Sequence, residues 1–185
     1  MALLGVGDPA PSFCLSDSSG SEFDLDAASG RPVLVMFMCN HCPYVKHVAA
    51  AIGALTKRWE RAGVTAVAIH SNDPQRYSSE DAYDLMAPFA HEHNWDFPYV
   101  IDASQAVAQV YTARCTPEFF LLDREHRIAY RGRLDGSRPS SDLPVTGDDL
   151  DAAIRSVADG RAAPTEQYPS VGCSIKWLPG NEPDQ

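Results

Sequence analysis

The feature that most constrains the fold is a change of hydrophobic period between residues 33 and 59. Val33–Met38 is an uninterrupted apolar run, which is typical of a strand buried on both faces. Downstream, apolar residues recur at helical spacing and the segment closes at Gly63. These positions are Val45, Val48, Ala49, Ile52, Leu55 and Trp59. A buried strand therefore leads into an amphipathic helix, with Cys39 and Cys42 at the junction.

The other segments predict further strands and helices around this unit. Alternating apolar residues between turn signals indicate strands, and a spacing of three or four residues indicates helices. The expected strands are Ser12–Leu15 and Glu22–Leu25 around a Ser18-Ser19-Gly20 turn, Val64–Ile69, Phe97–Ile101, and a hairpin of Phe119–Leu122 with Ile128–Arg131. The expected helices are Ser79–Asn94, which Pro88 should break or kink, Ser104–Thr112 and Asp148–Ala158.

This order of elements predicts the α/β class, with a mixed central sheet flanked by helices and an N-terminal β-hairpin extension over residues 1–30. Because nothing divides the chain, we expect a single domain over residues 1–160. Residues 161–185 form a tail that contains Tyr168, Val171, Ile175 and Trp177. These apolar side chains indicate that the tail packs back on the domain.

The formal net charge of −10 limits the kinds of partner. An acidic surface repels phosphate backbones and anionic membranes, so we expect no nucleic acid and no membrane partner. The first residues lack the pattern of a secretory signal, and no apolar segment approaches the roughly 20 residues of a membrane helix. Five cysteines, an odd number, do not indicate a disulfide scaffold at this length. We therefore expect a cytoplasmic protein.

The Cys39-Asn40-His41-Cys42 segment has the spacing of a redox-active pair. A helix N-terminus stabilises a thiolate, and the thiolate is the nucleophile in disulfide exchange. We expect Cys39 to attack and Cys42 to resolve the mixed disulfide. An imidazolium at His41 would stabilise the reduced form, so we predict a potential less negative than the value of about −270 mV for thioredoxin. A redox titration against glutathione tests this.

Zinc binding is the main alternative use of this segment. Structural zinc needs four ligands, and the sequence has no second CxxC pair. His41, His47, Cys115 or Cys173 would have to converge from distant segments. We therefore favour redox chemistry, and we expect no bound metal and no cofactor.

The segment Cys115-Thr116-Pro117-Glu118-Phe119 precedes an apolar strand and resembles the cis-proline loop of thioredoxin-like proteins. In that superfamily the loop faces the CxxC pair, and the backbone before the proline pairs with the substrate as an added strand. The resemblance implies a thioredoxin-like sandwich fold. It also implies that Thr116 binds the substrate backbone and that Pro117 is the cis-proline.

The N-terminal segment Gly7-Asp8-Pro9-Ala10-Pro11-Ser12-Phe13, followed by Asp17 and Gly20, is similar to the opening hairpin of the alkyl hydroperoxide reductase/thiol-specific antioxidant (AhpC/TSA) or redoxin group. The resemblance covers about residues 5–160. Asn40–Tyr44 and Gly172–Trp177 also resemble a subgroup of bacterial thioredoxin-family proteins.

Two positions depart from these relatives. Val33 stands where thioredoxins carry a buried aspartate, so proton transfer must use His41, another residue or water. Peroxiredoxins carry a threonine three residues before the peroxidatic cysteine, and here Met36 and Cys39 occupy the corresponding positions. Both departures weaken the match to a standard member of either group.

The leading hypothesis is a thiol–disulfide oxidoreductase that acts on protein or small-molecule thiols and disulfides. The alternatives are a thiol-dependent peroxidase with antioxidant activity, whose partners would include peroxides, and a metal-binding or interaction module that uses the same cysteines. Cys115 and Cys173 are candidate additional redox thiols, although a buried free cysteine often only packs. His70-Ser71-Asn72-Asp73 follows a buried strand, where either a ligand site or an ordinary turn is expected.

Overall fold

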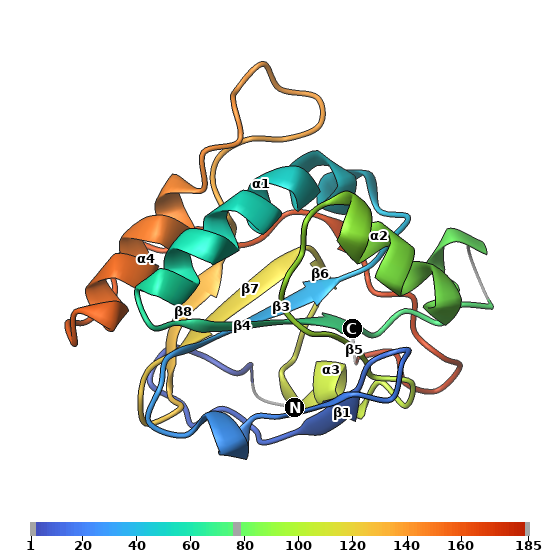
Figure 1. The fold of residues 1–185 in the computed structure, drawn as a ribbon, viewed down its shortest axis with the longest axis horizontal. Helices are drawn as coiled ribbons and strands as arrows, with labels where there is room; N and C mark the ends of the chain where they lie inside the picture. Colours follow the sequence, from blue (N-terminus) through green and yellow to red (C-terminus); the bar gives the residue numbers. More distant parts are fainter. Residues whose placement is uncertain (1–2, 76–78, 184–185) are drawn as a thin grey trace.

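A computed structural model describes residues 3–75 and 79–183. The outermost residues of the predicted domain (1–160) and of the predicted tail (161–185) lie outside the described part. The core of the fold is a five-stranded sheet in the order β5-β4-β3-β7-β8 (Figure 1). The first three of these strands are parallel, and β7 runs antiparallel to both of its neighbours. The sheet is therefore mixed, as predicted. Its strands are β3 (Val33–Met38), β4 (Thr65–His70), β5 (Tyr99–Ile101), β7 (Glu118–Leu122) and β8 (Ile128–Gly132).

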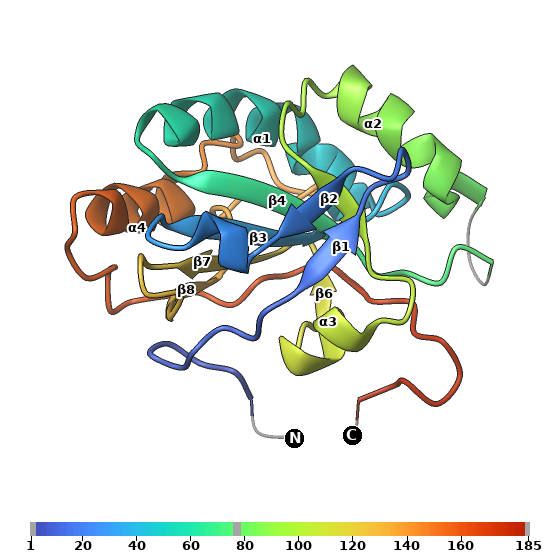
Figure 2. The ribbon, with the colours of Figure 1, turned by 60° about the horizontal axis from the view of Figure 1, so that its bottom comes forward.

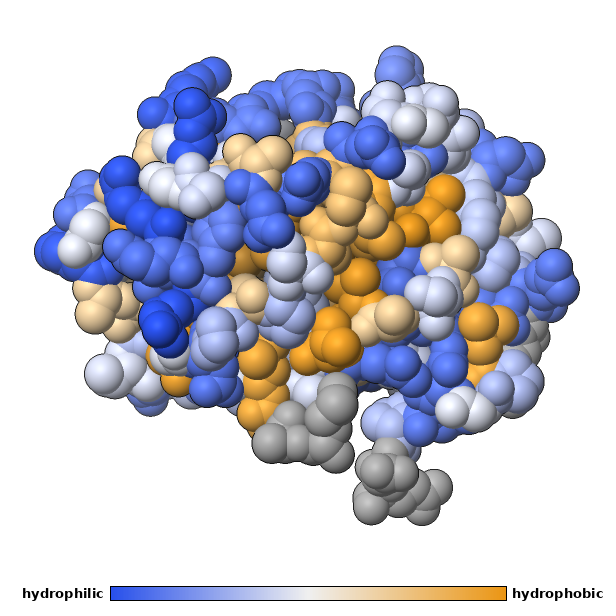
Figure 3. Space-filling view, turned by 90° about the horizontal axis from the view of Figure 1, so that it is seen from below, coloured by the Kyte–Doolittle hydropathy of each residue, from blue (hydrophilic) through white to orange (hydrophobic). Residues whose placement is uncertain are grey.

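Helices cover both faces of this sheet. In Figure 1, α1 (Pro43–Arg61), α2 (Met86–Glu92) and α4 (Asp148–Ala158) lie above it, and α3 (Ala106–Val110) lies below with the N-terminal hairpin. The alternation along β3 explains the two layers, because Leu34, Met36 and Met38 join one core while Val33, Val35 and Phe37 join the other. All six β3 residues are fully buried, as the apolar run predicted. Seen from below, the molecule shows apolar groups gathered towards the middle of the view, with polar groups around them (Figure 3).

The N-terminal hairpin pairs β1 (Cys14–Ser16) with β2 (Glu22–Asp24) across the predicted turn (Figure 2). Asp17 Oδ1 fixes the turn by accepting hydrogen bonds from the backbone N–H groups of Ser19 and Ser21. The rings of Phe13 and Phe23 join the core on the α3 side of the sheet, which we call the lower core. Because side chains alternate along a strand, Cys14 in β1 points outward and is exposed.

The predicted helix Ser79–Asn94 is wrong in length. Two short 3₁₀ turns, Ser79–Asp81 and Tyr83–Leu85, precede α2, which covers only Met86–Glu92. Pro88 does not break α2, because it lies in the first turn, where its missing N–H leaves no helical hydrogen bond unmade. Asp81 is buried and bonds to residues 40 and 41, which holds the segment in turns.

The third helix is also shorter than its predicted range. Left-handed φ angles at Gln105 (63°) and Thr112 (50°) confine α3 to the residues between them. Among the described residues, no helix is long and apolar enough to cross a membrane.

Part of the C-terminal tail packs against the rest of the chain. Ile175 and Trp177 are buried in the lower core, whereas Tyr168 and Val171 remain exposed. A strand that the sequence pattern did not reveal, β9 (Cys173–Ser174), pairs antiparallel with β6 (Cys115–Thr116). The tail thereby reaches the edge of the structure where the cysteine pair lies.

Candidate active site

The two cysteines of the CxxC segment are held by different elements. Cys39 directly follows β3, and Cys42 is the N-cap residue of α1 with Pro43 in the first helical position. Proline suits this position because its fixed φ matches the helix and its missing N–H is not needed there. Both cysteines are 0% exposed and are free thiols. The predicted junction of strand and helix is therefore confirmed, and it buries both sulfurs.

The Thr116-Pro117 loop lies against this pair. The peptide bond between these residues is cis, as the resemblance implied. Thr116 Oγ1 lies 3.2 Å from Cys39 Sγ, and the Thr116 carbonyl oxygen lies 3.2 Å from Cys42 Sγ. A single residue therefore contacts both sulfurs, and it brings a hydroxyl to Cys39 from a segment distant in the sequence.

The two thiols are coupled and ionise unequally. A hydrogen bond from the Cys39 thiol lowers the pKa of Cys42 to about 4, with further donors from Cys173 and the Val45 N–H. The same hydrogen bond, together with burial and the charge of Asp81, raises the pKa of Cys39 above its usual range. The coupling therefore favours the negative charge on Cys42, at the start of α1, over Cys39.

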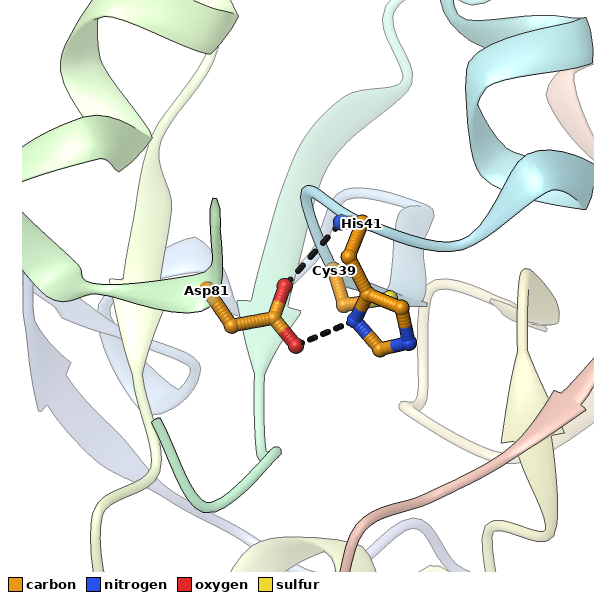
Figure 4. Close-up of side chains that lie close together, drawn as sticks. All are labelled: Cys39, His41 and Asp81. Carbon is orange, nitrogen blue, oxygen red and sulfur yellow. Dashed lines mark hydrogen bonds and ion pairs between the residues drawn. The ribbon is translucent and has the colours of Figure 1, made fainter. Parts of the chain in front are cut away.

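Asp81 organises the segment between the cysteines. Its Oδ1 accepts hydrogen bonds from the backbone N–H groups of Asn40 (2.9 Å) and His41 (3.1 Å), and its Oδ2 lies 2.5 Å from His41 Nδ1 (Figure 4). Asn72 Nδ2 donates to the same Oδ2 at 2.9 Å. Burial alone would raise the pKa of Asp81, but the nearby His70 imidazole and the hydrogen bonds from Asn72 and His41 hold it below its usual range. Asp81 is therefore a buried carboxylate beside Cys39.

Asn40 is fixed by partners on both sides. Its Nδ2 donates to the Glu80 carbonyl at 2.9 Å, and its Oδ1 accepts from the Tyr99 hydroxyl at 3.0 Å. With Asp81 holding the backbone, both residues between the cysteines are tied to the 79–81 turn. The loop is thus pre-organised rather than free to adapt.

The side chains of Cys39, His41 and Asp81 place three possible metal-ligand atoms within 4.8 Å of one another. The Asp81 oxygens, however, are already engaged by two backbone N–H groups and Asn72. His47, which a zinc site would have needed, does not join this cluster, because its Nε2 pairs with Ser137 Oγ at 3.0 Å. Three ligands with a committed carboxylate do not fit the four-coordinate zinc site considered above.

Of the two other candidate redox cysteines, Cys173 joins the site and Cys115 does not. Cys173 lies opposite Thr116 in the β6–β9 pair and joins the site, and burial raises its pKa to about 11. The Cys115 sulfur instead lies 3.8 Å from the Pro117 carbonyl oxygen, and burial raises its pKa to about 12. Sequence reasoning missed Asp81, because nothing local marks it among neighbouring acidic residues. Asn72, within the polar segment after β4, was the one available signal.

The chain is similar to known proteins over most of its length. Residues 6–131 match the AhpC/TSA family. The Thiol-disulfide oxidoreductase ResA of Geobacillus thermodenitrificans is 26% identical over 125 residues, covering 68% of this chain and 67% of that protein. ResA of Geobacillus kaustophilus is 27% identical, with the same coverage.

Solved structures extend the similarity over nearly the whole chain. An uncharacterized conserved protein from Geobacillus kaustophilus has a TM-score of 0.91 and 42% identity, covering 96% of this chain and 95% of that chain. A hypothetical protein from Sinorhizobium meliloti has a TM-score of 0.92 and 39% identity, covering 97% and 98%. A putative thiol:disulfide interchange protein DsbE from Chlorobium tepidum shares the fold, with a TM-score of 0.66 and 21% identity over 84% of this chain and 99% of that chain. The chain belongs to the AhpC/TSA family and has a thioredoxin-like fold.

Proposed function

We propose that the protein is a thiol–disulfide oxidoreductase that cycles Cys39 and Cys42 between dithiol and disulfide. The observation that carries the proposal is the geometry of the pair: Cys39 and Cys42 meet at the start of α1, and each sulfur lies 3.2 Å from Thr116 beside the cis Thr116-Pro117 bond. The relatives named thiol-disulfide oxidoreductase support this activity.

The reaction balances without a cofactor. Cys39 attacks a disulfide R–S–S–R′ to form a mixed disulfide, its proton passes to Cys42, and R′S⁻ leaves. Cys42 then attacks the Cys39 sulfur as its proton passes to the departing sulfur, which releases RSH and leaves the Cys39–Cys42 disulfide with two electrons transferred. The existing hydrogen bond gives the first proton its route. Substrates are protein or small-molecule disulfides, and the cytoplasmic location stays part of the proposal.

Insulin reduction by the Cys39→Ser and Cys42→Ser variants tests this function, run beside hydrogen peroxide consumption. We expect both variants to lose disulfide reduction because each lacks half of the pair. The exposed Cys14→Ser variant is the matched control and should behave like the wild type. Retained disulfide reduction in either variant would contradict the proposal, and peroxide turnover would favour the thiol-peroxidase alternative.

A further inference from the structure

The β9 strand covers the cysteine pair with the chain's own tail. Cys173 is the register partner of Thr116, and Ser174 is the partner of Cys115. Thr116 is also the residue that contacts both Cys39 and Cys42. Cys173 therefore lies across one strand pairing from the residue that touches the two redox sulfurs, and it packs against the core cluster that contains them.

Gly172 makes this approach possible. A Cβ at this position would lie 2.0 Å from the Thr116 carbonyl oxygen and 3.1 Å from the Pro117 nitrogen. No side chain fits in that space, because real Cβ atoms do not come so close to backbone atoms. The tail backbone consequently lies flat against the cis loop, and any larger residue would lift Cys173 away from the pair.

The tail is anchored on both sides of Cys173. Before it, Ser170 Oγ donates to the Gly132 carbonyl at 2.5 Å. After it, the Lys176 N–H donates to Asn72 Oδ1 at 2.9 Å, and the Leu178 N–H donates to Gln105 Oε1 at 2.7 Å. Asn72 is the same residue that bonds to Asp81, so the tail and the CxxC segment share a support.

The three cysteines differ in access. Cys39 and Cys42 are fully buried, whereas Cys173 is partly exposed. An external thiol therefore meets Cys173 before it meets the pair. In the reduced protein, burial and the hydrogen bond to the Cys42 thiolate raise the pKa of Cys173 to about 11. Oxidation of the pair removes the Cys42 charge, and that contribution to the raised pKa disappears with it.

We propose that Cys173 is a third redox-active cysteine, which exchanges the disulfide with Cys42. The inference rests on the proposed function and adds a step to it. In the oxidised protein the Cys173 thiolate attacks the Cys42 sulfur, a Cys42–Cys173 bond forms, and the Cys39–Cys42 bond breaks with Cys39 leaving as thiolate. No net oxidation occurs. An external thiol then attacks the partly exposed Cys173 sulfur and releases Cys42, and a second thiol equivalent completes the reduction.

Disulfide mapping tests the contact directly. The Cys39→Ser variant is oxidised with diamide, the remaining thiols are alkylated, and peptides are mapped by mass spectrometry without reduction. We expect a Cys42–Cys173 linkage, which should persist in Cys39→Ser/Cys115→Ser and vanish in Cys39→Ser/Cys173→Ser. A Cys42–Cys115 linkage, or only intermolecular disulfides, would overturn the proposal.

Reduction kinetics test the role. After oxidation of the pair, we expect reduction by dithiothreitol to slow at least tenfold in Cys173→Ser and in Gly172→Ala, but not in Cys14→Ser. Circular dichroism and the yield of the Cys39–Cys42 disulfide verify that each variant folds. A wild-type rate of reduction in Cys173→Ser would overturn the proposed role of Cys173. It would leave the proposed function intact, because insulin reduction by the wild type tests that function separately. If the wild type does not reduce insulin although mapping finds the Cys42–Cys173 linkage in Cys39→Ser, the proposed function is overturned instead.

Discussion

At the scale of single residues, the site depends on a carboxylate that supports the redox segment from a distance. Asp81 accepts the backbone N–H groups of Asn40 and His41, and it is fully buried. Its charge also contributes to the raised pKa of Cys39. It is a positioning residue, since it acts on the cysteines through the backbone and the local potential.

The Asp81→Asn variant should lower the free energy of unfolding by about 1–3 kcal/mol, because a buried hydrogen-bonding group loses well-matched partners. It should also lower the pKa of Cys39, because a neighbouring negative charge is removed. Urea denaturation and thiol titration measure the two effects. The nearby Glu80→Gln change, on a side chain that is 56% exposed, should shift stability by less than about 0.5 kcal/mol. An unchanged thiol titration in Asp81→Asn would show that the carboxylate is only structural.

Ionisation of Cys42 gives a second prediction at this scale. With its pKa lowered to about 4, Cys42 should hold a thiolate throughout the neutral range and become protonated only in acid. Thiolate absorbance near 240 nm should therefore stay constant from pH 8 to 6 and fall with a midpoint near pH 4. In Cys42→Ser this step should be missing. A midpoint near the usual thiol pKa of about 8.5 would contradict the coupling of the pair.

The sequence revealed only part of this site. Cys39, His41 and Cys42 are adjacent, and Thr116 and Pro117 form a recognisable motif, so local pattern was sufficient to find them. Asp81 and Asn72 act through contacts that span 41 and 104 positions. A local sequence pattern cannot predict contacts between residues so far apart, because they form only when the chain folds.

At the scale of elements, apolar spacing predicted the segments whose structure is set by burial alone. Val33–Met38 and Asp148–Ala158 match the observed β3 and α4 at both ends. The helix predicted over Ser79–Asn94 does not form over its full length. Asp81 instead turns inward and hydrogen-bonds to the redox segment, and this contact competes with helical hydrogen bonding. The prediction was thus wrong where a functional contact overrides local preference.

The contact between α1 and the end of α2 allows a test at this scale. A Cβ on Gly53 would lie 2.1 Å from the His93 carbonyl oxygen. Helix propensity alone would make Gly53→Ala stabilising by about 1 kcal/mol. We expect the opposite sign, a loss of about 1–3 kcal/mol in the free energy of unfolding, because the added methyl overpacks the contact.

Urea denaturation of Gly53→Ala measures this effect, and Ala50→Gly is the control. Ala50 is exposed on the same helix, so its change should show propensity alone and destabilise by about 1 kcal/mol. A Gly53→Ala protein more stable than the wild type would mean that the two segments move apart at little cost.

At the scale of the whole molecule, the tail completes both the lower core and the redox site. Ile175 and Trp177 are buried among residues of the hairpin and α3, while Cys173 lies two positions earlier beside the cysteine pair. The apolar residues of the tail predicted that it packs back, but not where. Its destination depends on Gly172 fitting the cis loop and on Asn72 and Gln105 accepting its backbone.

This coupling predicts that damage to the core releases the site. Ile175 is 3% exposed, so Ile175→Ala should cost about 2–5 kcal/mol of stability by leaving a cavity, and it should loosen β9. Cys173 should then react faster with iodoacetamide at a denaturant concentration where the domain remains folded. Val171→Ala, on a side chain that is 43% exposed and precedes the same strand, should change neither stability nor alkylation. If Ile175→Ala lowers stability but leaves Cys173 alkylation at the wild-type rate, the strand is held by its hydrogen bonds to Asn72 and the cis loop alone, and the buried side chain does not position the third thiol.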